Sequence, residues 1–262
     1  MTSPTAGRLF QEGRLAEAID AANATVKTAP GDVGARILLA ELLLYAGNLE
    51  RADAVLDATA AIDPGAGLVV AEFRQLLRAA IARRQVLREG RVPEFLGEPT
   101  PTQRHALEAL TALRAGDVMA AAIAADAAET ARPAVAGRTP DAEFTDYRDA
   151  DDLWGGSFEV LTTTGKYFWI PTERVVSLEF HPPQRPRDLF WRRCTMVVRD
   201  GPDGDVYVPA LYDAVVAADD GIRLGRRTDW TETAPIQGAG QRMFLVGDAG
   251  FAIQQLTTME FA

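Results

Sequence analysis

A motif in the first half of the chain returns after 34 residues. Residues 13–18 read Gly-Arg-Leu-Ala-Glu-Ala, and residues 47–52 read Gly-Asn-Leu-Glu-Arg-Ala. Pro30 returns as Pro64 at the same spacing, and a third copy begins at Gly116, close to two further periods along the chain. A glycine turn that is followed by an apolar helical pattern at this spacing predicts antiparallel helix pairs, which bury their apolar faces by stacking on their neighbours.

The period and the Gly-x-Leu-x-x-Ala start of each second helix resemble the tetratricopeptide repeat. Local signals agree, because Asp32 is a suitable N-cap and Thr100 to Gln103 has the pattern of a capping box with a first-turn proline. Asp63-Pro64 ends the second helix of the second pair. We expect residues 1–138 to form a helical tetratricopeptide-like repeat domain, with a generic bundle of helical hairpins as the alternative.

The pattern changes after residue 138. Residues 139–152 are rich in aspartate and lose the helical period, which indicates an acidic linker. From Gly155 onward the apolar residues alternate, and short runs of this kind are separated by turns such as Thr164-Gly165. We expect residues 153–262 to form a small antiparallel β domain, either a barrel or a sandwich, so that the whole chain is a two-domain α+β protein.

Composition excludes several classes of protein. The net charge is −10, and residues 139–262 carry 12 basic against 20 acidic side chains, whereas a nucleic-acid-binding protein needs a positive surface. No apolar run is long enough to span a membrane, and no secretory signal is visible at the N-terminus, so a cytoplasmic location is expected. One cysteine and two histidines predict no disulfide and no zinc site.

The sequence patterns of common catalytic and metal sites fail in this chain. Lys166 is not followed by Ser or Thr as in a phosphate-binding loop, and Glu159 replaces the second glycine that a nucleophilic Ser157 would need. Cys194 lies in an apolar strand pattern, and a calcium loop that started at Asp149 would need glycine where Trp154 stands. We therefore expect no enzyme, cofactor or metal; an uncharacterised enzyme in the β-rich domain is the alternative.

Two features of the helical half suggest a partner-binding groove. The first helix of the second pair would present Arg36, Leu39 and Leu43 to the concave side of an array, where a short helix or extended peptide binds. Between residues 68 and 88, arginines recur on one helical face and form a basic stripe, whose plainer interpretation is a solvated face. The candidate partner-binding residues are Arg36, Leu39, Leu43, Arg74 and Arg78.

The β-rich half contains two sets of Arg, Asp and Trp residues. One lies in residues 181–193, where prolines, arginines and aromatic residues stand together, and the other lies in residues 224–230. They either form a recognition surface or an internal knot in which Arg187 pairs with Asp229, or Arg226 with Asp188. With one strand residue, the structural or recognition residues are Trp169, Arg187, Asp188, Trp191, Arg226, Asp229 and Trp230.

Five segments, in this order, resemble the ImpE family. They are Gly-Lys-Tyr-Phe-Trp-Ile-Pro at 165–171, Pro-Gln-Arg-Pro-Arg-Asp-Leu-Phe-Trp at 183–191, Pro-Ala-Leu-Tyr at 209–212, Leu-Gly-Arg-Arg-Thr-Asp-Trp at 224–230 and Gly-Ala-Gly-Gln-Arg at 238–242. The resemblance implies a cytoplasmic, non-enzymatic adaptor of a bacterial type VI secretion system. It also implies two partners, an N-terminal helix of the small sheath subunit and the ClpV unfoldase. A general repeat scaffold for another complex is the alternative.

Overall fold

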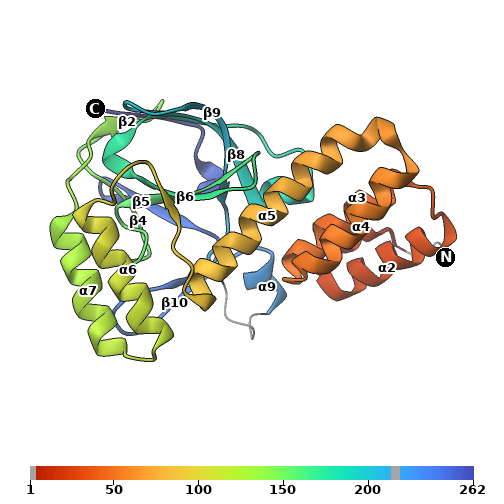
Figure 1. Cartoon of the computed structure of the whole chain (residues 1–262), viewed down its shortest axis with the longest axis horizontal. Coiled ribbons are helices and arrows are strands. Elements are labelled where there is room, and N and C mark those ends of the chain that lie inside the picture. The colour runs from red at the N-terminus through yellow and green to blue at the C-terminus, as the bar shows by residue number, and fades with distance from the viewer. Residues whose placement is uncertain (1–3, 214–218) are drawn as a thin grey trace.

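The structure, a computed structural model, describes residues 4–213 and 219–262. Its helices gather at the two ends of a strand-rich centre, and one long helix crosses between them (Figure 1). None of the helices in the described ranges combines the length and apolarity that a membrane span needs. The larger helices are α1 (Ala6–Gln11), α2 (Leu15–Thr28), α3 (Val33–Tyr45), α4 (Leu49–Ile62), α5 (Gly67–Glu89), α6 (Pro101–Arg114) and α7 (Val118–Ala131).

The helices begin and end where the local signals predict. The Asp32 side chain accepts a hydrogen bond from Ala35 N at 2.9 Å, and the capping box of Thr100 is formed. The turns that join each pair need a left-handed residue, which glycine supplies: φ is 71° at Gly47 and 76° at Gly116. The helix pairs α1–α2, α3–α4 and α6–α7 confirm the prediction from the repeats.

The three pairs do not form one continuous array. Helices α2, α3 and α4 lie side by side at one end of the molecule, and α6 and α7 lie at the other (Figure 1). Between them runs α5, a single helix of 23 residues that begins 34 residues after α3, at the position of the first helix of a further repeat. The third pair therefore does not stack on the second, because α5 separates them and α6–α7 packs on α5 and the strand-rich half instead.

The strands form three sheets in the described part of the chain. The largest has nine strands in the order β1-β6-β5-β9-β8-β7-β14-β2-β3, the second is β13-β12-β4, and the third is the hairpin β10-β11. Among the strands of the described residues, only β1 pairs in parallel, with β6. The strands of the large sheet are β1 (Glu94–Phe95), β2 (Gly137–Arg138), β3 (Glu143–Phe144), β5 (Ser157–Thr162), β6 (Tyr167–Pro171), β7 (Val175–Phe180), β8 (Trp191–Val198), β9 (Asp203–Pro209) and β14 (Thr258–Phe261). The others are β4 (Tyr147–Asp149), β10 (Thr228–Trp230), β11 (Gly238–Gly240), β12 (Met243–Val246) and β13 (Ala249–Ala252).

The sheets are open, so the predicted barrel is wrong. The two ends of the large sheet, β1 and β3, are strands of two residues that lie at opposite edges and do not pair with each other. The small sheet packs on the large one instead: Tyr147 of β4 stacks on Phe158 of β5 with ring centroids 5.3 Å apart. The hairpin predicted around Thr164-Gly165 is present as β5–β6, and β8–β9 and β12–β13 are further hairpins. Strand β14 follows β13 in the chain but belongs to the large sheet.

Short helical segments complete the fold. They are η1 (Pro64–Ala66), η2 (Thr172–Arg174), α8 (Pro186–Phe190), α9 (Asp220–Arg223) and η3 (Ile253–Gln255). Two of the three buried apolar clusters contain residues from both the helical and the strand-rich half. The segment 139–152 includes strands β3 and β4, and its Asp149 and Asp151 are buried. The boundaries 1–138, 139–152 and 153–262 stay a prediction, while the packing joins the two halves through common cores.

Candidate protein-interaction site

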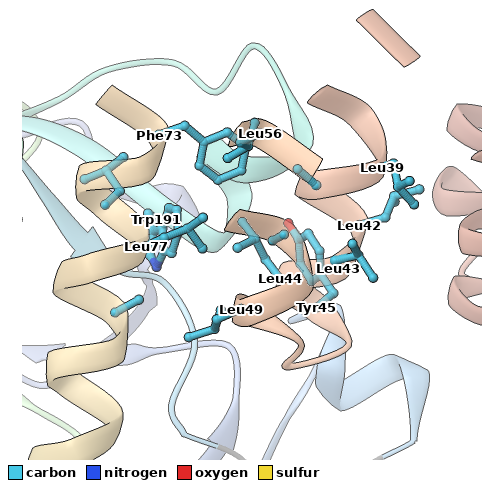
Figure 2. Close-up of a cluster of buried hydrophobic side chains, with 14 of the residues drawn as sticks. Leu39, Leu42, Leu43, Leu44, Tyr45, Leu49, Leu56, Phe73, Leu77 and Trp191 are labelled. Carbon is cyan, nitrogen blue, oxygen red and sulfur yellow. The ribbon is translucent and has the colours of Figure 1, made fainter. Parts of the chain in front are cut away.

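Segment 184–191 lies against the helical repeats. The Tyr45 hydroxyl of α3 donates a hydrogen bond to the Pro186 carbonyl at 2.5 Å, and the Phe190 ring meets the Tyr45 ring edge-on at 5.0 Å. Trp191 meets Phe73 of α5 edge-on at 6.0 Å. Figure 2 shows Trp191 beside Phe73 and Leu77, with the leucines of α3 on the other side. The repeats thus bury a segment of their own chain where a peptide-binding repeat array would bind a ligand.

Arg187 holds this segment to α5. It is 8% exposed, its guanidinium lies 5.1 Å from the centre of the Phe73 ring, and its Nη2 is 3.3 Å from Glu72 Oε1. Tyr207 donates a hydrogen bond to the same Glu72 oxygen at 2.7 Å. Asp188 accepts hydrogen bonds from the backbone N–H groups at the start of α8. Arg187 and Asp188 thus make contacts inside the protein, and a recognition role for this motif stays a prediction.

Neither of the two ion pairs that were predicted for an internal knot, Arg187 with Asp229 and Arg226 with Asp188, is formed. Arg187 pairs with Glu72 and not with Asp229, which lies 3.3 Å from Arg227. Arg226 does not pair with Asp188; its Nη2 donates to the backbone carbonyls of residues 10 and 11 at 2.8 and 2.7 Å. Helices α5 and α1 therefore supply the partners that each motif was predicted to find in the other.

Glu41 of α3 is a buried acid at the same contact. It is 3% exposed, its Oε1 has no hydrogen-bond partner among the described residues, and the nearest cation is Arg185, with Nε 3.5 Å from Oε1. Burial raises the pKa of Glu41 to about 7, against the opposing effect of Arg185. This carboxyl group is poorly satisfied, so its protonation is coupled to the packing of segment 184–191 on α3.

A cavity of about 270 Å³ lies between the α3–α4 turn, helix α5 and the strand-rich half. We call it the junction cavity. Its apolar lining comes from both halves: Leu44, Tyr45, Leu49, Ala80, Phe190, Trp191, Leu211, Tyr212 and Ile222. Ala46 and Gly47 of the α3–α4 turn also line it, as do Arg83, Arg84, Arg88, Asp213 and Arg223. A hollow with an apolar interior and several guanidinium groups can bind an apolar side chain that has carboxylates beside it.

The arginines of the junction cavity differ in how firmly they are held. Arg84 pairs with Glu50, whose side chain is 62% exposed, and Arg88 pairs with Asp213 at 2.9 Å. Arg83 is largely buried and pairs with Glu159, its Nε lying 2.6 Å from Oε1. Exposed pairs contribute little to stability and can exchange partners, so Arg84 and Arg88 are the available cations.

Sequence reasoning missed the ionic cluster behind the cavity. Glu159 has 0% exposure and is paired with Arg83 and Arg242. Arg242, also fully buried, lies 3.5 Å from Asp149, which accepts a hydrogen bond from Tyr212 at 2.6 Å. Burial alone would raise the pKa of Glu159, but the two arginines lower it to about 2. The sequence carries no signal for this cluster, because Glu159 alternates with apolar residues as a solvent-facing side chain would, whereas β5 is buried on both faces.

A second hollow, of about 390 Å³, borders the cluster on the side of α6 and contains Asp151. Burial raises the pKa of Asp151 to about 7. Both of its carboxylate oxygens accept backbone hydrogen bonds, from Leu153 N at 2.9 Å and from Gly238 N at 2.8 Å. This carboxyl group therefore anchors two loops. No group of three or more His, Cys, Asp or Glu in residues 4–213 and 219–262 is arranged to hold a metal ion.

The structure does not bring the predicted partner-binding residues together on an open groove. Leu39 and Leu43 are each 2% exposed and belong to the core. Arg36 donates to the Pro30 carbonyl at 2.7 Å, Arg74 pairs with Asp53 and Asp57 of α4, and Arg78 is exposed. The basic stripe is thus partly neutralised by α4, and a partner contact at these five residues stays a prediction.

The remaining predicted residues are tryptophans in different environments. Trp169 is 1% exposed and donates from Nε1 to the Tyr167 hydroxyl at 2.8 Å. Trp230 is 39% exposed on the β10–β11 hairpin, with its ring 5.7 Å from that of Tyr212. Trp169 and Trp191 are core residues, whereas Trp230 remains accessible.

Known proteins match this chain in both halves. The model of the ImpE protein family matches residues 141–260, and that of the tetratricopeptide repeat matches residues 9–82. The type VI secretion system accessory component TagJ of Pseudomonas aeruginosa is 31% identical over 258 residues, which are 98% of this chain and 90% of that protein. The crystal structure of protein VPA1032 from Vibrio parahaemolyticus has a TM-score of 0.91 at 26% identity, covering 98% of this chain and 97% of the other.

Proposed function

Because this chain belongs to the ImpE family, we propose that it is a non-enzymatic adaptor of a bacterial type VI secretion system. It binds the small sheath subunit through a helix near that subunit's N-terminus and links it to the ClpV unfoldase in the cytoplasm. The observation that carries the proposal is the similarity to the accessory component TagJ over 98% of the chain. That length includes the helical repeats, the junction with the strand-rich half and both arginine-rich motifs.

The architecture supports binding of a protein partner. Helical repeats bind short helices and extended peptides in grooves that join apolar anchors to charged edges. The junction cavity offers both features, since its interior is apolar and arginines line it. The cluster of Glu159 with Arg83 and Arg242 joins the two halves, so the cavity is held between parts that are fixed relative to each other.

Copurification tests the proposal. The tagged chain is expressed together with the complete secretion cluster, and its bound proteins are identified by mass spectrometry. We expect the small sheath subunit and ClpV, and we expect a sheath subunit without its N-terminal helix to be lost from the complex. Absence of both proteins would contradict the adaptor function, and capture of other proteins of the cluster would favour the general scaffold.

A further inference from the structure

We propose that the junction cavity receives an apolar side chain of the protein partner and that Arg84 and Arg88 bind carboxylates beside that side chain. The partner segment is therefore acidic as well as apolar. The inference rests on the proposed adaptor function, and it adds both the place of binding and the chemistry of the bound segment.

The size of the cavity limits what enters it. Its volume of about 270 Å³ is the volume that roughly nine water molecules occupy in liquid water. It lies below the range of about 300–1,000 Å³ that is usual for drug-sized ligands. Leu49 and Trp191 in its wall are 6% and 2% exposed, so this part of the wall is apolar and already packed. It fits one or two large side chains of a helix that lies across its mouth.

The charge of the cavity is opposite to that of the chain. The whole chain has a net charge of −10, yet four arginines and a single acidic residue, Asp213, are among the described residues that line this hollow. Arg83 is neutralised by the buried Glu159. The positive charge that a partner can meet therefore comes from the more exposed Arg84 and Arg88. A local excess of positive charge on an acidic protein favours a partner segment with carboxylates.

A partner carboxylate can replace the present ion pairs at small cost. Glu50 and Asp213 keep 62% and 33% of their side-chain surface exposed, so water already surrounds much of each carboxylate. Such exposed pairs contribute little to stability. The planar guanidinium groups of Arg84 and Arg88 bind carboxylates with two parallel hydrogen bonds, which a partner held by its apolar anchor can supply.

The test uses Ala46, which lines the cavity, is exposed, and has the helical backbone conformation that any residue tolerates (φ −79°, ψ −2°). Ala46→Glu adds a negative charge at the cavity, Ala46→Lys adds a positive one, and Ala46→Trp adds bulk. The internal repeat offers a matched control, Ala115→Glu, because Ala115 holds the equivalent position before Gly116 with φ −79° and ψ −6°. Binding of the small sheath subunit is measured by calorimetry at two salt concentrations.

We expect Ala46→Glu and Ala46→Trp to weaken binding at least about tenfold and Ala46→Lys, which adds no like charge to an acidic partner, to weaken it clearly less than Ala46→Glu, while Ala115→Glu, outside the cavity, binds within about twofold of the unmodified chain. We also expect binding by the unmodified chain to weaken as salt rises. Equal loss in Ala46→Glu and Ala46→Lys would overturn the acidic character of the partner. Unchanged binding in all Ala46 variants would overturn the cavity as the site while the adaptor function stands. No binding by the unmodified chain would remove the adaptor function itself.

Discussion

Arg83 of α5 and Glu159 of β5 form a double hydrogen-bonded ion pair across the junction of the two halves. The Nε–Oε1 distance is 2.6 Å and the Nη2–Oε2 distance is 3.0 Å. Glu159 is fully buried and is also paired with Arg242 from the strand-rich half. Because one arginine from each half pairs with the same buried carboxylate, ion pairs as well as apolar packing join the helical repeats to the sheets.

We expect Glu159→Gln to destabilise the protein by about 3–5 kcal/mol. The substitution keeps the shape of the side chain but leaves Arg83 without its buried counter-charge and Arg242 with Asp149 alone, 3.5 Å away. Urea unfolding at pH 7 measures the loss. Glu50→Gln is the matched control, because it removes the carboxylate of an exposed pair with Arg84 and is expected to cost less than about 1 kcal/mol. Equal effects of the two substitutions would mean that the buried pair contributes no more than a surface pair.

Arg187→Ala should lower the melting temperature by roughly 5–10 °C. The side chain lies over Phe73 and pairs with Glu72, and its removal opens the packing of segment 184–191, with an expected cost of about 2–3 kcal/mol. Arg187→Lys should recover little, since an ammonium group does not reproduce the planar contact with the ring. Calorimetry compares both variants with Arg78→Ala, an exposed position on α5. An unchanged melting temperature with lost partner binding would give Arg187 a surface role instead.

Local features of the fold were predictable from the sequence because short-range chemistry determines them. Asp32 and Thr100 cap helices with their own side chains, and Gly165 permits the left-handed turn between β5 and β6 at φ 84°. How the strands assemble depends on contacts far apart in the chain. Strand β14 follows the β12–β13 hairpin in the chain but pairs with β7 in the large sheet. The alternation of apolar and polar residues does not specify which strands pair, so it could not distinguish an open sheet from a barrel.

The candidate site was harder to predict for the same reason. The motif around Arg187 was identified, but its partner Glu72 is 115 residues away and carries no local signal. Glu159 alternates with apolar neighbours and so suggests a solvent-facing position; β5 is instead covered by α5 on one face and by the small sheet on the other. In this arrangement of α5, the large sheet and the small sheet, the ion-pair partner of a buried residue depends on how whole helices and strands pack. The sequence pattern does not specify that packing.

Leu43→Asp is expected to unfold the protein and not merely to block a partner. Leu43 is 2% exposed in the cluster that Figure 2 shows, and a carboxylate there has no partner to offset its burial. We expect a loss above about 4 kcal/mol, seen as a non-cooperative or absent thermal transition. The exposed substitution Ala46→Glu, three residues along, should melt within about 2 °C of the unmodified chain. A folded Leu43→Asp variant that fails to bind the sheath subunit would restore this leucine as a contact.

Glu41→Gln should stabilise the protein at neutral and alkaline pH. Burial raises the pKa of Glu41 from about 4.5 in the unfolded chain to about 7, so the folded state binds the proton more tightly than the unfolded state does. Stability therefore falls as the pH rises from about 4.5 to about 7 and remains reduced above that range. A neutral amide avoids this loss, so the variant should exceed the unmodified chain by on the order of 3 kcal/mol at pH 8.

The same two proteins should have similar stability near pH 4.5, where Glu41 is protonated in the folded state. Urea unfolding at intervals between pH 4.5 and pH 8 measures the difference, and subtraction of the two curves removes the contribution of the other acids. Glu50→Gln, at an exposed glutamate, serves as the control and should show a nearly constant difference from the unmodified chain between pH 6 and pH 8. A difference between Glu41→Gln and the unmodified chain that does not grow with pH would show that Arg185 already neutralises the buried carboxylate.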